Sequence, residues 1–287
     1  MKQLKLIHFI FLLCLFVLAF STHSIASQKD GLLKIYFLDV GQGDAIFIEM
    51  PNGNQILIDG GPDNKILSEL ADTMPFYDRD IDVVVATHTH ADHITGLAEV
   101  LKRYDVANVI ESGDKNISPI YGEWEKIIKE EDANYTKAIA GEIIDMGDET
   151  TLTVLTPLKS YDGVILKNSH EANVTILLQY KSFRVLLAGD MEIPLERQLL
   201  LSGGDVSADV LKVGHHGSKT SSGELFLSAV HPKLGFIEVG GGNQYGLPAP
   251  AILSRLENFG IKYYRTDIDG SIKIVSDGTN YQLIPNY

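Results

Sequence analysis

The chain has 287 residues, with 24 lysines and arginines against 38 aspartates and glutamates, which gives a formal net charge of −14. Such an acidic surface repels polyanions at long range and argues against tight, non-specific nucleic-acid binding, although a divalent cation can supply local positive charge. No linker, low-complexity tract or repeat divides the sequence. We therefore expect one large α/β domain.

The first 26 residues have the pattern of a secretory signal peptide. A basic start precedes an apolar run from Leu6 to Phe20 and a small-residue cleavage site at Ser24-Ile25-Ala26. The run is short for a membrane span, and a retained N-terminal anchor is the alternative. We predict a signal peptide at residues 1–26 and a mature domain at 27–287, secreted or at the cell surface, with no stable membrane partner after cleavage. Cys14 lies in the leader, so the mature chain has no disulfide.

Strand-like segments open the mature part. They run from Leu33 to Val40, from Ala45 to Met50 and from Gln55 to Ile58, and Asn52-Gly53 is a strong hairpin signal between the last two. Asp59 follows this hairpin, before a helix-like segment from Asn64 to Thr73. A carboxylate there could orient a metal-ligating histidine, with an ordinary turn aspartate as the alternative.

The central motif is Thr-His-Thr-His-Ala-Asp-His, from Thr87 to His93. It lies between an apolar strand, Ile81 to Ala86, and a helix-like segment, Ile94 to Tyr104. Four potential ligands fall within it: His88, His90, Asp92 and His93. Imidazole and carboxylate together suit zinc or manganese.

The spacing of these ligands indicates two metals. His88 and His90 can face one ion from an extended backbone, because residues two apart point the same way along a strand. Asp92 and His93 then turn towards a second ion as the helix begins. A solvated loop of histidines is the alternative.

Further elements follow in order, with a strand at Ala107 to Ile110, a helix at Gly122 to Asp132, and strands at Thr150 to Leu155, Asn173 to Tyr180 and Phe183 to Leu187. The last strand leads to Ala188-Gly189-Asp190. A carboxylate at a strand end can bridge two cations roughly 3.5 to 4 Å apart, as two-metal sites require. We therefore expect Asp190 to bridge the metals.

The segment from Asp209 to Ser222 again places histidines at the end of an apolar strand. We take His215 as the ligand that completes the second metal position, because it lies nearer to the strand, and give His216 a role in orienting substrate or protonating a leaving group. Lys219, between two hydroxyl residues, suits a phosphate oxygen. A solvated surface lysine is the alternative for this residue.

Strands and one helix alternate to the end, at Leu234 to Val239, Pro250 to Phe259 (the helix), Ile261 to Arg265 and Gly270 to Val275. Two strand-rich halves with helices can pack sheet against sheet, with the helices outside. The predicted ligands would then gather where the strand ends meet.

With these motifs assembled, the chain resembles the metallo-β-lactamase fold superfamily, and more closely the hydrolase domain of ComEC-type DNA-uptake competence proteins. The shared segments are 37–44, 87–93, 187–190, 209–222, 264–266 and 269–270. The resemblance implies an α/β fold of four αββα layers and a dinuclear site. Its ligands would be His88, His90, Asp92, His93, Asp190 and one of His215 and His216, with His170 at about the place of a further histidine.

Two features depart from that family. ComEC-type proteins join this domain to a many-helix membrane channel, whereas only a signal peptide is expected here. The family motif Tyr-Gly-His-Pro-His-Pro also reads Tyr-Gly-Leu-Pro-Ala-Pro, so Leu247 and Ala249 replace both histidines. We expect specificity or rate to differ as a result.

The predicted function is a secreted, dinuclear metal-dependent phosphoesterase, with nucleic acid such as DNA among its substrates. The ions would lower the pKa of a water towards roughly 7, and Asp92 would hold the resulting hydroxide in line. The alternatives are hydrolysis of a carboxylic ester, a lactone or an envelope choline phosphoester, and a metal-holding binding module without catalysis. Antibiotic hydrolysis does not follow from the superfamily name, because fold does not fix function.

Overall fold

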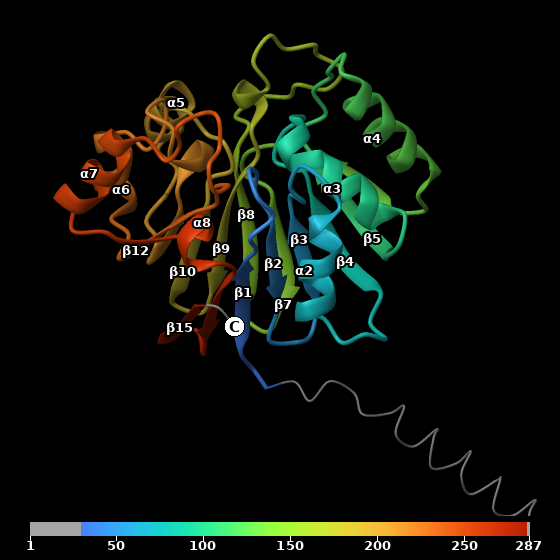
Figure 1. Cartoon of the computed structure of the whole chain (residues 1–287), viewed down its shortest axis with the longest axis horizontal. Helices are drawn as coiled ribbons and strands as arrows, with labels where there is room; N and C mark the ends of the chain where they lie inside the picture. The colour runs from blue at the N-terminus through green and yellow to red at the C-terminus, as the bar shows by residue number, and fades with distance from the viewer. Residues whose placement is uncertain (1–29, 286–287) are drawn as a thin grey trace, which may run out of the picture.

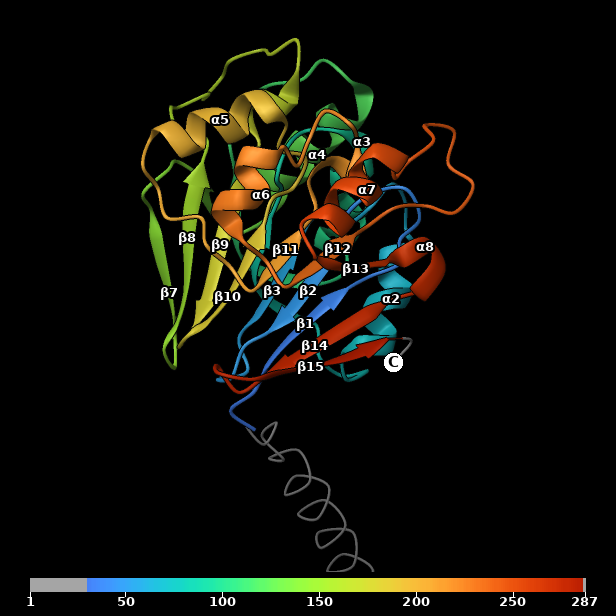
Figure 2. The same ribbon diagram turned by 90° about the vertical axis from the view of Figure 1, so that its left-hand side faces the viewer.

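The computed structural model describes residues 30–285, so the leader predicted at residues 1–26, with Cys14, lies outside the described residues. Two β-sheets pack face to face, and helices cover both outer faces (Figure 1 and Figure 2). This is the four-layer αββα sandwich that the sequence predicts. None of the described helices combines the length and the apolar character needed to cross a membrane.

The first sheet has eight strands in the order β15-β14-β1-β2-β3-β4-β5-β6. These strands are β1 (Leu33–Phe37), β2 (Ile46–Glu49), β3 (Gln55–Ile58), β4 (Asp80–Val85), β5 (Asp105–Glu111), β6 (Asn134–Lys137), β14 (Ile272–Ser276) and β15 (Tyr281–Pro285). The β2–β3 hairpin is antiparallel, whereas β3 to β6 run parallel. The carboxyl ends of β3, β4 and β5 therefore meet at one edge of the sheet.

The second sheet has seven strands in the order β13-β12-β11-β10-β9-β8-β7. These are β7 (Ile143–Gly147), β8 (Thr150–Thr156), β9 (Thr175–Tyr180), β10 (Phe183–Leu187), β11 (Val210–Lys212), β12 (Leu234–Ile237) and β13 (Lys262–Arg265). Strands β10 to β13 run parallel. Their carboxyl ends form a second edge, and this edge faces the first across the sandwich.

Each sheet carries its own layer of helices. The helical segments are α2 (Lys65–Thr73), α3 (Ala91–Leu101), α4 (Pro119–Glu130), α5 (Ile193–Leu201), α6 (Glu224–Val230), α7 (Pro250–Asn258), the short α8 (Thr266–Asp269), and two 3₁₀ turns, η1 (Ser169–Ala172) and η2 (Gly214–Gly217). Helices α2 to α4 pack on the first sheet through one apolar cluster. Helices α5 to α7 pack on the second sheet through another.

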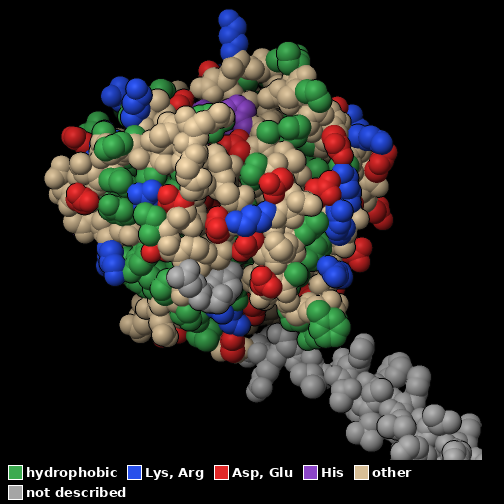
Figure 3. Space-filling model, viewed as in Figure 1, with side chains coloured by type: hydrophobic (Ala, Val, Ile, Leu, Met, Phe, Trp, Pro, Cys, Tyr) green, Lys and Arg blue, Asp and Glu red, His purple; other side chains and the backbone are tan. Residues whose placement is uncertain are grey.

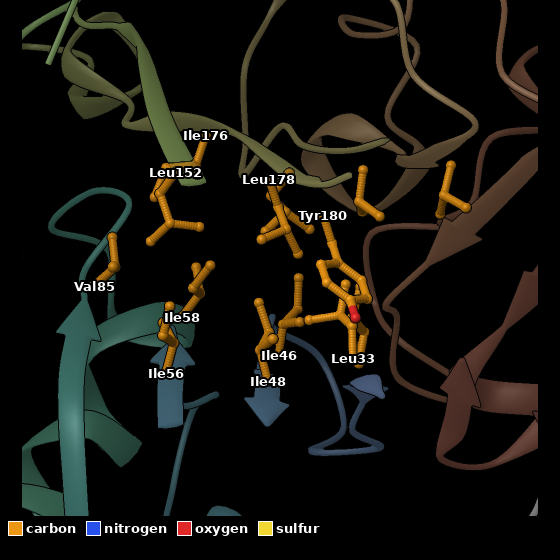
Figure 4. Packing of buried hydrophobic residues seen from close by; sticks show 14 of the residues in the cluster. Leu33, Ile46, Ile48, Ile56, Ile58, Val85, Leu152, Ile176, Leu178 and Tyr180 are labelled. Carbon is orange, nitrogen blue, oxygen red and sulfur yellow. The ribbon is translucent and has the colours of Figure 1, made fainter. Parts of the chain in front are cut away.

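The central core lies between the two sheets. Alternate side chains of β2 and β3 point inward and meet side chains of β8 and β9, as Figure 4 shows for Ile48, Ile58, Leu152 and Leu178. Because successive residues of a strand face opposite ways, the same strands also supply the outer clusters. Burial of these apolar side chains holds the two edges of strand ends in a fixed relation.

Candidate metal centre

The predicted ligands lie where strands from both sheets end. His88 and His90 follow β4, Asp190 follows β10, and His215 and His216 form η2 directly after β11. Histidine side chains reach the surface at the upper end of the molecule in Figure 3. The two sheets thus bring residues more than a hundred positions apart into one cluster.

The first group of donors is His88, His90 and His170. Their donor nitrogens lie within 4.8 Å of one another. The ring centroids of His88 and His90 are 4.6 Å apart, and those of His90 and His170 are 4.7 Å apart. Burial lowers the pKa of all three, that of His170 to about 4. Neutral imidazoles are the form that binds metal, so this group is ready to do so.

The second group is Asp92, His93 and His216. Asp92 and His93 lie in the first turn of α3, and His216 Nε2 is 3.4 Å from Asp92 Oδ2. Burial alone would lower the pKa of His93 and of His216, but the Asp190 carboxylate raises both well above the usual range. Burial alone would raise the pKa of Asp92, but His93 and His216 hold it well below the usual range. Without metal, this group is a compact cluster of opposite charges.

Asp190 lies between the two groups. Its Oδ2 is 3.4 Å from Nε2 of both His93 and His216, and 3.7 Å from Nε2 of His170. The distance from Oδ2 to His88 Nε2 is 3.9 Å. The Asp190 backbone N–H donates to Asn173 Oδ1 at 2.8 Å, which fixes the start of the loop. A single carboxylate oxygen therefore faces both groups.

In three of the histidine rings, Nδ1 has a hydrogen-bond partner, which leaves Nε2 free. Nδ1 of His88 is 3.1 Å from Thr87 Oγ1, His93 Nδ1 donates to Asp59 Oδ2 at 2.8 Å, and His216 Nδ1 donates to the Glu238 carbonyl at 2.9 Å. Thr87 Oγ1 itself donates to Asp59 Oδ2. Each ring therefore turns Nε2 towards the centre.

Four Nε2 atoms of the centre are buried and have no hydrogen-bond partner among the described residues, namely those of His88, His93, His170 and His216. Leaving a buried polar atom unpaired costs about 1–3 kcal/mol. Four such nitrogens around one carboxylate oxygen are the donor set that a divalent metal prefers. The residues present therefore fit a metal centre.

The two adjacent histidines of η2 differ in their surroundings. His216 is buried beside Asp92, whereas the side chain of His215 is 24% exposed and its Nε2 is 3.9 Å from Asp190 Oδ2. Both have a left-handed backbone, with φ of 49° and 51°, so nearness to the strand does not decide which ring points inward. The sequence predicts His215 as the ligand. The structure brings Nε2 of His216 nearer to Asp190, while His215 forms a further possible metal group with His170 and Asp190.

Residues 38–237 match the family model described as the metallo-beta-lactamase superfamily. The chain belongs to this superfamily. Its fold binds divalent metal ions, and its clusters of His and Asp can hold them.

Two curated relatives show which members of the superfamily this chain resembles. The chain is 28% identical to ComE operon protein 3 of Bacillus subtilis over 84% of its own length and 32% of that protein. It is 30% identical to Recombination protein 2 of Haemophilus influenzae over 92% of its length and 31% of that protein. It therefore spans about a third of the curated relatives it matches, and the predicted resemblance to competence proteins is confirmed.

Solved structures support the fold. The metallo-beta-lactamase fold protein YhfI from Bacillus subtilis superposes with a TM-score of 0.53 at 11% identity, over 81% of this chain and 96% of that one. At this identity the likeness concerns the fold alone.

Around the metal centre of this metallo-β-lactamase-fold chain, Lys219 lies exposed on the turn after η2. A cavity of about 340 Å³ adjoins the centre, and His170 and Glu192 form the shared wall. Lys159 and Tyr161 also line it, with the Lys159 ammonium 5.1 Å from the Tyr161 ring. This cavity has room for a substrate group next to the metal ligands.

Three buried polar residues beneath the centre escaped the sequence interpretation. Asp44 Oδ1 lies 3.1 Å from His216 Nδ1, and Lys212 and Glu238 are fully buried beside Asp44. In the sequence, Asp44 is visible only as the last residue of a glycine-containing turn. A lysine inside an otherwise apolar strand was the one available signal for Lys212.

Leu247 and Ala249 pack against the apolar cluster of the second helical layer. The side chains that replace the two family histidines are therefore partly buried hydrophobics. They bring no polar atom to the metal centre.

Proposed function

We propose that this chain hydrolyses phosphoesters, including phosphodiesters in nucleic acid, with two divalent ions, zinc or manganese. His88, His90 and His170 would hold one ion, and Asp92, His93 and His216 the other. The observation that carries the proposal is the position of Asp190 Oδ2, within 3.9 Å of histidine nitrogens from both groups. A shared carboxylate oxygen is what a two-ion centre needs.

When bound, divalent ions activate water and neutralise charge on a phosphoryl group. The protein's own residues then position the reactants. Asp92 belongs to the second group, and its side chain is 32% exposed. It can therefore also accept a hydrogen bond from the attacking water. His215 Nδ1 lies 3.4 Å from Glu192 Oε1, which orients the ring so that Nε2 can donate to a leaving-group oxygen.

Two lysines beside the centre favour an anionic substrate. Among the described residues, Lys219 and Lys159 have no carboxylate partner, whereas Lys102, Lys115 and Lys137 are each paired with a carboxylate. Lys219 follows η2, and Lys159 lines the cavity next to His170. An unpaired ammonium at each side can bind phosphate oxygens, which a neutral ester lacks.

We place the protein outside the cytoplasm or at the cell surface. The basic start and apolar run of residues 1–26 support this location. The printed name of one relative, Competence protein ComA of Neisseria gonorrhoeae, supports a role near DNA uptake; it is 39% identical over 31% of this chain.

The test is hydrolysis by purified, metal-stripped protein reloaded with zinc or manganese. The substrates are bis(p-nitrophenyl) phosphate, single-stranded DNA, duplex DNA and p-nitrophenyl acetate. We expect metal-dependent cleavage of the phosphodiesters that falls about 10³-fold or more in Asp190→Ala. Asp63→Ala, an exposed position on the loop after β3, is the matched control and should retain activity.

Each other result selects a different function. Hydrolysis of the acetate alone would move the substrate to a carboxylic ester or lactone. Metal binding without hydrolysis of any substrate would make the chain a binding module. Phosphodiester cleavage that survives complete metal removal would refute the proposal.

A further inference from the structure

Lys212 is a buried ammonium directly beneath the candidate metal centre. It is the last residue of β11 and has no exposed surface. Its Nζ forms an ion pair with Asp44, donates to the Gly189 carbonyl at 2.9 Å and lies 3.7 Å from Asp190 Oδ1. The lysine thus contacts the oxygen of Asp190 that points away from the histidines.

Several buried acids surround this lysine. Asp44 and Asp190 are each about 1% exposed, and Glu238 is not exposed at all. Burial, together with nearby Asp44, raises the pKa of Glu238 well above its usual range, so this side chain stays neutral. Burial alone would lower the pKa of Lys212, but Asp44 and Asp190 raise it. The Lys212 ammonium therefore faces one oxygen of each of two carboxylates, Asp44 and Asp190, whose other oxygens lie beside His216.

This charge has two opposite effects on the centre. Buried carboxylates are unfavourable unless a cation or hydrogen bonds compensate them, so Lys212 stabilises the fold when no metal is bound. The same charge repels any divalent ion that approaches Asp190 Oδ2, because Coulomb repulsion is only partly screened in the interior. Removing it should therefore weaken the metal-free fold and tighten metal binding.

We propose that Lys212 is an internal counter-ion that, together with the nearby histidines, balances the charge of Asp44 and Asp190 before metal binds, and that it reduces the affinity of the centre for metal. The inference rests on the metal centre of the proposed function. In such a site the carboxylates are already in place when metal arrives. The site also releases metal more readily than the same ligands would without the Lys212 ammonium.

The experiment compares wild type with Lys212→Met in the full chain. Thermal melting is followed without metal and at saturating zinc, and zinc affinity is measured by competition with a chromogenic chelator. We expect the metal-free Tm of the variant to fall by about 10 °C and its zinc Kd to fall at least about tenfold. The difference in Tm from wild type should shrink at saturating zinc.

Glu238→Gln is the matched buried control, because it replaces a neutral acid with a neutral amide. Its zinc Kd should stay within about threefold of wild type. An unchanged or weaker zinc affinity in Lys212→Met would overturn the proposal, as would an equal loss of Tm with and without zinc.

A second pair of variants keeps the test decisive if Lys212→Met does not fold without metal. Asp44→Asn leaves the ammonium with one carboxylate fewer and should weaken zinc binding about tenfold. Adding Lys212→Met to Asp44→Asn should restore tighter binding; equal affinity in the single and double variants would refute the counter-ion role. Zinc binding without hydrolysis would refute the proposed reaction and leave this result intact.

Discussion

Asp59 Oδ2 accepts a hydrogen bond from His93 Nδ1 at 2.8 Å, on the side of the ring opposite to the Nε2 that faces Asp190. The same carboxylate accepts from the backbone N–H and the hydroxyl of Thr87. Through Thr87 it also reaches the ring of His88, so one buried acid orients a histidine of each group.

Asp59→Ala should lower zinc affinity about 10- to 100-fold, because the ring of His93 loses the partner that holds its orientation. Competition with a chromogenic chelator gives the measurement. Asp63→Ala, exposed on the same loop, should bind zinc as tightly as wild type. Equal affinity in the two variants would show that Asp59 acts only as a turn residue.

The sequence predicted the sandwich and the place of the centre because both depend on local patterns. Apolar strands ending in His or Asp are visible in the chain, and β4, β10 and β11 lie where they were expected. Boundaries were less accurate. Helix α4 begins at Pro119 rather than Gly122, since Ser118 caps it by accepting from the Tyr121 N–H.

Several features depended on contacts that a sequence does not display. No element was predicted for β6, β7 or α5. Strand β6, for example, is exposed throughout and is held by its pairing with β5, not by an apolar pattern. The Asp44–Lys212 ion pair joins residues 168 positions apart. Only the folded chain shows that these two lie beneath the metal centre.

Gly96→Ala should destabilise the protein and weaken metal binding. A Cβ at Gly96 would lie 1.8 Å from the Gly60 carbonyl oxygen, so α3 would have to move away from the loop, and His93 with it. Thermal melting and zinc titration both report this. Gly122→Ala is the control, because a Cβ there meets nothing within 4 Å. Within a helix that change should stabilise by about 0.5–1 kcal/mol. Equal effects of the two substitutions would contradict the packing.

Phe236→Ala should cost about 3–5 kcal/mol of unfolding free energy. Phe236 is 1% exposed and stacks on Phe37 of the opposite sheet, with ring centroids 4.1 Å apart. Urea unfolding measures the loss. Phe259→Ala, at a position that is 40% exposed, should cost about 1 kcal/mol or less. A similar cost at both positions would mean that the two sheets are not joined through this ring pair.

Ionisation of the buried Glu196 carboxyl should lower the free energy of unfolding as pH rises. The side chain is 2% exposed and accepts from the backbone N–H groups of Ser222 and Gly223, on the segment that follows the turn of Lys219. Burial raises the pKa of Glu196 to about 7. Because this folded value exceeds that of the unfolded chain, the native state binds the extra proton, and its stabilising effect is complete below about pH 4.5.

As pH rises from about 4.5 to 7, that contribution is lost, by about 3 kcal/mol in total. Glu196→Gln cannot ionise, so the difference in unfolding free energy between variant and wild type should change by that amount between pH 4.5 and pH 8, in favour of the variant at the higher pH. Urea unfolding at the two pH values measures it. Glu224→Gln, at an exposed position of α6, should keep the wild-type dependence. If Glu196→Gln shows that dependence too, the carboxyl ionises in the fold without penalty, and the segment after Lys219 is held independently of pH.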